Sequence, residues 1–267
     1  MNYRRNVAYN YVGDYVFKIG DYVTRRKYNN DIVFKIINIV GDVYHLKGVS
    51  VRLYADSFKD DLEQCNSEIN ADDFRPTIDE YRELDRNEYF YLPGRILHLD
   101  GDSEYLSRCM KFYKKNKIMA YGLHIIEDDM PSRVQELLKK YTPDILVLTG
   151  HDAFSRNKRE KYKNTSSFVL AVSEARKYEK SHEKLFIIAG ACQSNYEDLI
   201  KAGANFASSP KRINIHALDP AIVAACLSFS NKNKDIDIMK ILSKTKYGSS
   251  GMGGIITKGS MYIGYPR

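Results

Sequence analysis

Two short segments that are apolar on both faces constrain the fold of this chain most strongly. They are DILVLT at 144–149 and KLFIIA at 184–189. A strand with no polar face must be covered on both sides, which is typical of parallel sheets. Apolar residues at helical spacing lie around these segments, at 103–115, 131–141, 168–178 and 195–202. We therefore predict an α/β domain over residues 94–267, with a parallel sheet and flanking helices.

The remaining elements of this domain are weaker in pattern. Strands are expected at 95–100 and 120–126, and a buried helix at 220–230. The glycine-rich tail carries two short β-like pieces, at 255–257 and 261–263.

The amino-terminal part has a different sequence pattern, in which short runs rich in β-branched residues are separated by Gly-Asp and Asn-Asn-Asp turns. Such a meander predicts a small β-barrel, which we interpret as an SH3-like unit over residues 1–55. Residues 56–93 are charged with few apolar anchors, so a linker with a short helix is expected there. Pro93-Gly94 marks the expected boundary with the α/β domain.

The basic balance of the chain raises the question of a nucleic-acid partner. The formal net charge is +7, but the excess is divided among separate patches at 111–117, 156–163 and 240–246. Solvated helix faces and loops explain such a distribution better than a binding surface does, because charge alone is weak support for nucleic acid. No apolar run reaches the ~20 residues that span a bilayer, and the start is too polar for a secretory leader. A protein of the cell interior with reduced thiols and no membrane partner is expected.

The chemistry is expected where the strands end, since open parallel sheets bind ligands at the carboxyl ends of their strands. The third expected strand ends in Gly150-His151, and the fourth in Gly190-Ala191-Cys192. Consecutive strands usually lie side by side at about 4.8 Å, so the imidazole and the thiol are expected to share one crevice. A thiol beside an imidazole and a helix start has the parts of an activated nucleophile, and the Cys192 amide could serve an oxyanion hole.

Each of these residues also has a structural reading. A buried intracellular cysteine is more often a small core residue than a nucleophile, and His151 could cap a loop. Cys109, Cys226 and Cys65 are interpreted as structural, and His216 as packed near the same crevice. No CxxC pair, HExxH, P-loop or well-placed GxGxxG occurs, so neither a metal nor a cofactor is expected.

The order of strand–Gly-His and strand–Ala-Cys resembles the caspase–gingipain–clostripain group of cysteine peptidases. In that group the histidine follows the third strand and the cysteine the fourth, which implies a caspase-like domain. Those enzymes usually have glycine directly after the histidine. Here that position is Asp152, which leaves the second oxyanion donor open.

A longer resemblance covers nearly the whole chain. GDYVTRRKYNNDIVFKI, LTGHDAF, AGACQSNYEDLIKAGANFASSP and INIHALDP are together similar to the YabG family of sporulation-specific peptidases. The resemblance implies a cysteine endopeptidase of the mother cell that processes spore coat and germination proteins after Arg or Lys. It also implies association with the forespore surface or spore coat, and self-cleavage in the linker or amino-terminal segments. The family's catalytic pair falls on His151 and Cys192.

Several alternatives stay open at this point. Residues 203–209 resemble a late strand of a TIM barrel, although only about 170 residues follow the linker where such barrels typically need ~250. A non-enzymatic basic binding module of the spore coat is the other alternative. Basic P1 specificity would need an acidic pocket residue, and the sequence does not rank its candidates. These are Asp219, Asp152, Asp100 and Asp102. The sequence also leaves the oligomeric state open.

Overall fold

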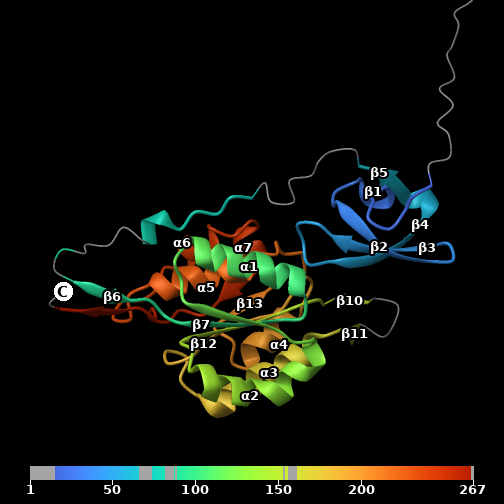
Figure 1. Ribbon diagram of the computed structural model, residues 1–267. Coiled ribbons are helices and arrows are strands. Elements are labelled where there is room, and N and C mark those ends of the chain that lie inside the picture. The colour runs from blue at the N-terminus through green and yellow to red at the C-terminus, as the bar shows by residue number, and fades with distance from the viewer. Residues whose placement is uncertain are drawn as a thin grey trace, which may run out of the picture. The chain divides into compact units, whose positions relative to one another are not determined.

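The two apolar segments form the centre of one six-stranded sheet in the computed structural model (Figure 1). They contain β9 (Ile145–Thr149) and β12 (Phe186–Ala189), and every residue of both strands is buried. The strand order is β14-β13-β12-β9-β7-β8, with all neighbours parallel except β14, which is antiparallel to β13. The other strands are β7 (Ile96–Asp100), β8 (Ala120–His124), β13 (Phe206–Ser208) and β14 (Met252–Gly254). The predicted α/β fold with a largely parallel sheet is confirmed.

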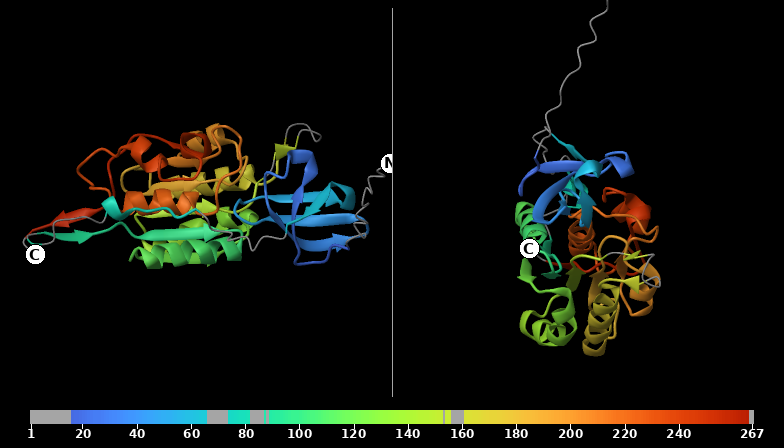
Figure 2. Two further views of the ribbon diagram at one scale, coloured as in Figure 1. Left: turned by 90° about the horizontal axis from the view of Figure 1, so that it is seen from above. Right: turned by 90° about the vertical axis from the view of Figure 1, so that its right-hand side faces the viewer.

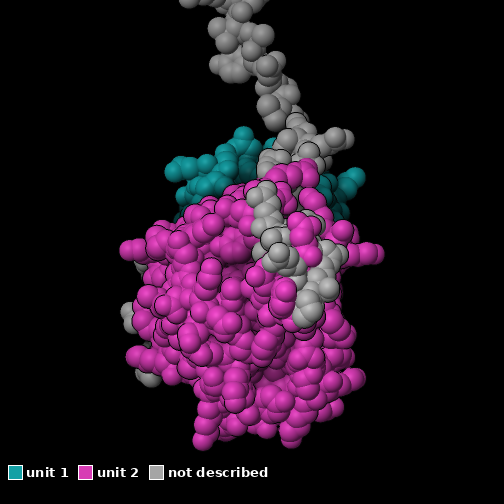
Figure 3. All heavy atoms as spheres, turned by 90° about the vertical axis from the view of Figure 1, so that its left-hand side faces the viewer, with its two compact units in different colours: residues 1–47, 55–67 teal, residues 48–54, 68–267 magenta. Residues whose placement is uncertain are grey.

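The structure describes residues 16–65, 74–81, 87, 89–152, 154–155 and 161–265. The chain divides into two compact units (Figure 3). One consists of residues 1–47 and 55–67, and the other of residues 48–54 and 68–267. Residues 48–54 therefore cluster with the α/β unit, although they come from the middle of the amino-terminal sequence.

Alternate residues along the central strands point to opposite faces of the sheet and pack into two separate cores. Ile145 and Val147 pack into one core, and Leu146 and Leu148 into the other. Helices cover both faces, as Figures 1 and 2 show. The first core is covered by α1 (Ser103–Lys115), α5 (Asp219–Phe229) and α6 (Ile238–Leu242), and the second by α2 (Met130–Tyr141), α3 (Thr165–Tyr178) and α4 (Tyr196–Lys201). A short α7 (Gly248–Gly251) leads into β14.

Several short strands are not predicted from the sequence, and one of them bears on the TIM-barrel alternative. Residues 206–208 form β13 beside β12, within the segment that resembles a late barrel strand. In the described part of the chain this sheet is open, with β14 and β8 at its edges, and it does not close into an eight-stranded barrel.

The amino-terminal unit is a five-stranded antiparallel sheet in the order β4-β3-β2-β1-β5. Its strands are β1 (Tyr22–Arg25), β2 (Phe34–Val40), β3 (Val43–Gly48), β4 (Tyr54–Phe58) and β5 (Leu62–Gln64), with 3-10 turns η1 (Arg26–Tyr28) and η2 (Lys59–Asp61). The expected β unit is present, and its SH3-like character stays a prediction.

The beginning of the expected linker folds as part of this sheet. Asp61 explains why a charged stretch does so, because its carboxylate accepts hydrogen bonds from the Lys27 amide, Ser57 Oγ and Arg25 Nε. Residues 66–73, 82–86 and 88 of the expected linker lie outside the described residues. The described remainder contains η3 (Asp79–Tyr81) and β6 (Phe90–Leu92), which pairs with β15 (Tyr262–Gly264). The division at residues 55 and 93 stays a prediction.

None of the helices in the described ranges combines the length and the hydropathy needed to cross a bilayer.

Candidate active site

The carboxyl ends of three adjacent strands bring Asp102, His151 and Cys192 to one edge of the sheet. Asp100 of β7 pairs with Thr149 of β9, and the same register continued past the strands sets Asp102 opposite His151. Cys192 follows β12, which pairs with β9, and Ser194 Oγ in the same loop donates to Asp152 Oδ2, next in sequence to His151. A carboxylate, an imidazole and a thiol therefore follow three neighbouring strands.

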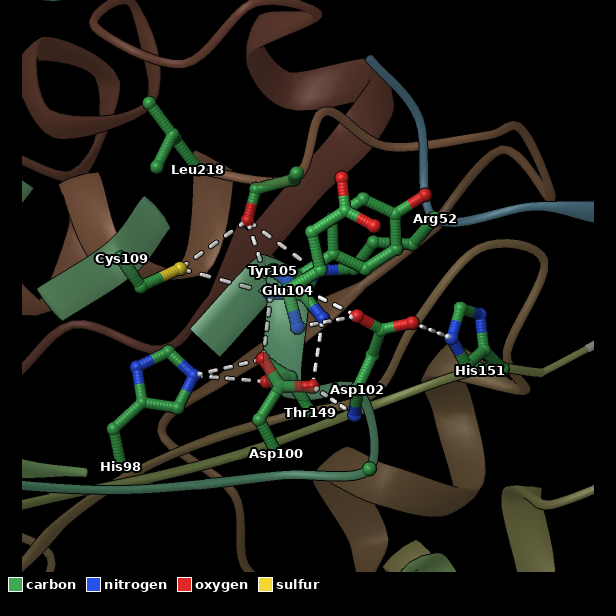
Figure 4. Close-up of polar contacts among 12 residues, drawn as sticks. Arg52, His98, Asp100, Asp102, Glu104, Tyr105, Cys109, Thr149, His151 and Leu218 are labelled. Atoms are coloured by element: carbon green, nitrogen blue, oxygen red, sulfur yellow. Dashed lines mark hydrogen bonds and ion pairs between the residues drawn. The ribbon is translucent and has the colours of Figure 1, made fainter. Parts of the chain in front are cut away.

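Asp102 holds the imidazole of His151 and is itself held by α1. His151 Nε2 lies 2.9 Å from Asp102 Oδ2 (Figure 4). The other carboxylate oxygen accepts hydrogen bonds from the Glu104 and Tyr105 amides and so caps α1. A carboxylate fixed by a helix terminus orients a histidine well, because neither group is free to turn away. The sequence predicts Asp102 only as a candidate pocket acid. An aspartate at the N-cap of a helix, two residues after a strand, is the signal that points to its place beside His151.

The second ring nitrogen of His151 has no hydrogen-bond partner among the residues that the structure describes. Nδ1 is buried there, while the backbone amide of His151 donates to Glu127 Oε1 at 2.6 Å. The rings of Tyr54 and Tyr105 lie 4.1 and 5.7 Å from the imidazole between centroids. With Nε2 facing a carboxylate, Nδ1 is the nitrogen that can accept a proton from a neighbouring group.

Cys192 is fully buried and takes the thiol form in this conformation. Its sulfur accepts a hydrogen bond from the Ile215 amide at 3.2 Å and lies 3.6 Å from the Ile215 carbonyl oxygen. Burial raises the pKa of the Cys192 thiol to about 12. The activation by a helix start that the sequence predicts is therefore absent in the conformation described. The physical reason is that α4 begins four residues beyond Cys192, while the sulfur lies in an apolar core.

Sharp turns on both sides of Cys192 fix its backbone. Gly190 has a φ of +107° and Gln193 a φ of +59°. The Gln193 amide donates to Ser209 Oγ, and the Ala191 amide donates to Ser194 Oγ.

Asp152 ties the loops of His151 and Cys192 together. Its carboxylate accepts hydrogen bonds from Ser194 Oγ at 2.9 Å, from the Asn164 amide at 2.8 Å and from Thr165 Oγ1. Asp102 contacts the ring of His151, whereas Asp152 contacts the neighbouring loops.

The carboxylate of Asp100 pairs with the guanidinium of Arg52. Arg52 is fully buried and makes two parallel hydrogen bonds to Asp100, of 2.9 and 2.8 Å (Figure 4). The pKa of the Asp100 carboxyl is held below its ordinary value by Arg52 and His98, against the opposing effect of burial.

Three potential metal ligands also meet beside this pair, namely His98, Asp100 and Cys109. Arg52 Nη2 contacts both Asp100 and Cys109, and the two nitrogens of His98 face Tyr113 and Thr149. The cation at this cluster is the guanidinium.

Two further predicted residues, Asp219 and His216, lie close to Cys192 in a buried layer. Asp219 accepts hydrogen bonds from the His216 and Lys246 amides, and burial raises its pKa to about 6. His216 packs edge-on against Phe74, and burial lowers its pKa to about 3. His216 is thus packed near the crevice, as expected from the sequence.

Comparison with known proteins identifies relatives of the whole chain. The family model described as YabG peptidase U57 matches residues 18–83 and 70–266. The sporulation-specific protease YabG of Bacillus subtilis (strain 168) is 40% identical over 285 residues, which cover 94% of this chain and 98% of that protein. No solved structure matches the chain.

Proposed function

Because this chain belongs to the YabG peptidase U57 family, we propose that it is a cysteine endopeptidase in which Cys192 is the nucleophile and His151 its base. That the chain is a peptidase of sporulation follows from its family and from its relative in Bacillus subtilis. The observation that supports the cysteine mechanism is the hydrogen bond between Asp102 and His151, in a loop that Asp152 ties to the loop of Cys192.

The chemistry assigns one role to each residue. His151 Nδ1 takes the thiol proton, and the thiolate of Cys192 attacks the carbonyl carbon of the scissile bond. His151 then donates this proton to the leaving amine, and water hydrolyses the acyl-enzyme. Asp102 keeps the ring in place and stabilises the imidazolium that forms between these steps.

The buried thiol requires a change before reaction. At a pKa of about 12, the thiolate is a minor species at neutral pH. Reaction therefore needs a conformation in which the Cys192 sulfur leaves the Ile215 backbone and meets His151. The backbone amide of Cys192 would then serve as one oxyanion donor, with the second donor still unassigned.

The substrates that we propose are spore coat and germination proteins, cleaved after Arg or Lys. The proposed site of action is the mother-cell cytoplasm, at the forespore surface or spore coat. The sporulation-specific relative supports this setting.

Substitution of the two residues tests the mechanism. Cys192→Ala and His151→Ala should each abolish hydrolysis of an arginine-containing protein substrate, with circular dichroism unchanged. Cys65→Ala, at a partly exposed cysteine of the other unit, is the matched control and should retain full activity. Undiminished hydrolysis by Cys192→Ala would overturn the assignment.

A further inference from the structure

The connection between β3 and β4, residues 48–54, is a tight bend that lies in the α/β unit. The bend is closed by its own backbone, since the Gly48 amide donates to the Leu53 carbonyl at 2.7 Å and the Leu53 amide to the Val51 carbonyl at 2.9 Å. A Cβ at position 48 would come within 2.5 Å of the Val51 carbonyl oxygen, so the bend requires glycine there. The connection therefore presents its side chains from a fixed backbone.

The α/β unit holds this backbone from α1 and from the segment before α5. Tyr105 Oη donates to two carbonyl oxygens of the connection, at 2.6 and 2.8 Å, and Arg108 Nη1 donates to a third at 2.8 Å. On the other side, the Ala217 amide donates to the Ser50 carbonyl at 3.1 Å. The bend is thus fastened beside Asp102, which caps the same helix α1.

Two side chains of the connection pair with the two carboxylates that end and follow β7. The guanidinium of Arg52 makes its two hydrogen bonds to Asp100, and both groups are fully buried. Two residues further along, Tyr54 Oη donates to Asp102 Oδ2 at 3.2 Å. The carboxylates are themselves linked, because the Asp102 amide donates to Asp100 Oδ1 at 3.0 Å. The buried ion pair therefore fixes the backbone next to Tyr54.

The ring of Tyr54 covers one side of the His151 imidazole. The two ring centroids are 4.1 Å apart, and the hydroxyl meets His151 Nε2 at one shared acceptor, Asp102 Oδ2. Burial and the Asp102 carboxylate raise the pKa of the Tyr54 hydroxyl above its ordinary value, so it stays protonated and donates at neutral pH. Tyr54 thus contacts both the imidazole and the carboxylate that orients it.

We propose that Tyr54 is a positioning residue of the peptidase, which fixes the orientation of His151 by sharing the Asp102 carboxylate with it. This inference rests on the proposed function and adds a residue from the amino-terminal part of the sequence to its site. The α/β domain predicted at 94–267 is then incomplete as a peptidase, because the connection between β3 and β4 supplies part of the support for the base.

A double-mutant cycle in the full chain tests this coupling. Tyr54→Phe keeps the ring and removes only the hydroxyl, so circular dichroism should be unchanged. For a peptide with arginine at P1, kcat should fall about tenfold with KM unchanged, because a hydrogen bond to a charged group is lost away from the substrate. In the Asp102→Asn background, the same substitution should change kcat by less than about twofold, because the group through which Tyr54 acts is already absent.

Tyr178→Phe is the matched control for the loss of a tyrosine hydroxyl. Tyr178 is 40% exposed, as Tyr54 is, and it lies at the end of α3. Its substitution should leave both kcat and KM unchanged.

The outcomes separate this inference from the proposed function. Full kcat in Tyr54→Phe would overturn the positioning role. The same tenfold loss in both backgrounds would also overturn it, because the effect would then not pass through Asp102. A raised KM with unchanged kcat would assign Tyr54 to substrate binding and contradict the proposal as well. Hydrolysis by Cys192→Ala would instead overturn the proposed function.

Discussion

At the scale of single residues, the two nitrogens of His151 have opposite surroundings. Nε2 faces the carboxylate of Asp102 at 2.9 Å, while Nδ1 is buried with no hydrogen-bond partner in the described part of the chain. This asymmetry fixes which nitrogen exchanges protons in the proposed mechanism. Asp102 also caps α1, so the helix supports the orientation of the imidazole.

Substitution of Asp102 by Asn tests this positioning role. Asparagine still caps a helix, so the unfolding temperature should stay near that of the wild type. The imidazolium loses its carboxylate, and kcat should fall about 100-fold or more, with little change in KM. Asp144→Asn, at the amino end of the same sheet and bonded to Arg95, is the control and should keep its kcat. Full kcat in Asp102→Asn would contradict the role.

The buried His216 predicts a pH dependence of stability. Burial lowers its pKa from the ordinary value of 6.5 to about 3 in the folded chain, so the unfolded chain binds more protons between these values. The stability that neutral His216 contributes is complete above pH 6.5 and decreases as the pH falls, by about 1.4 kcal/mol per pH unit. Asp219, with its pKa raised to about 6, acts in the opposite direction, so the comparison must be between variants.

Urea unfolding at pH 7, 5.5 and 4.5 measures this dependence. His216→Asn keeps a hydrogen-bond acceptor near the Leu218 amide, which donates to His216 Nδ1 in the wild type. The loss of stability between pH 7 and 4.5 should be smaller in the variant. Equal losses in both proteins would exclude His216 as a source.

At the scale of elements, the turns after the strands decide where the reactive side chains stand. Gly190 ends β12 with a φ of +107°, and a Cβ there would meet Leu199 Cδ1 at 2.8 Å. Both the backbone conformation and the close approach require glycine at this position.

Gly190→Ala should therefore displace Cys192 and lower activity by at least tenfold, with a loss of about 1–3 kcal/mol in unfolding free energy. Gly20→Ala is a matched control, since Gly20 has a φ of +101° but open space around its Cβ position. Gly20→Ala should lose only the unfolding free energy that corresponds to the strained backbone conformation, and it should keep its activity. Equal activity in the two variants would show that the turn does not position the nucleophile.

The sequence predicts some of these elements well and others poorly, for physical reasons. Fully apolar strands such as β9 and β12 can be predicted, because burial on both faces requires a continuous run of apolar residues in the sequence. The strands β13 and β5 have three residues each, too few for a pattern to stand out. The positions of His151 and Cys192 after their strands could be predicted, whereas the partnership of Arg52 with Asp100 could not, since it depends on pairing between distant segments.

At the scale of the whole molecule, two units share one chain in an interleaved way. Residues 48–54 cluster with the α/β unit, while residues on both sides of them belong to the amino-terminal unit. The chain enters residues 48–54 from the amino-terminal unit and leaves them into the same unit. Both ends of the segment are therefore tied to that unit by the chain itself, without a covalent cross-link.

The central claim is that Cys192 is the nucleophile, and covalent trapping tests it most directly. The full chain, incubated until its activity is constant, is treated with a peptidyl-arginine chloromethyl ketone and mapped by mass spectrometry. The account predicts one adduct on Cys192, complete loss of activity, and no adduct in His151→Ala. Inactivation with the adduct on Cys65, Cys109 or Cys226, and Cys192 unmodified, would contradict it.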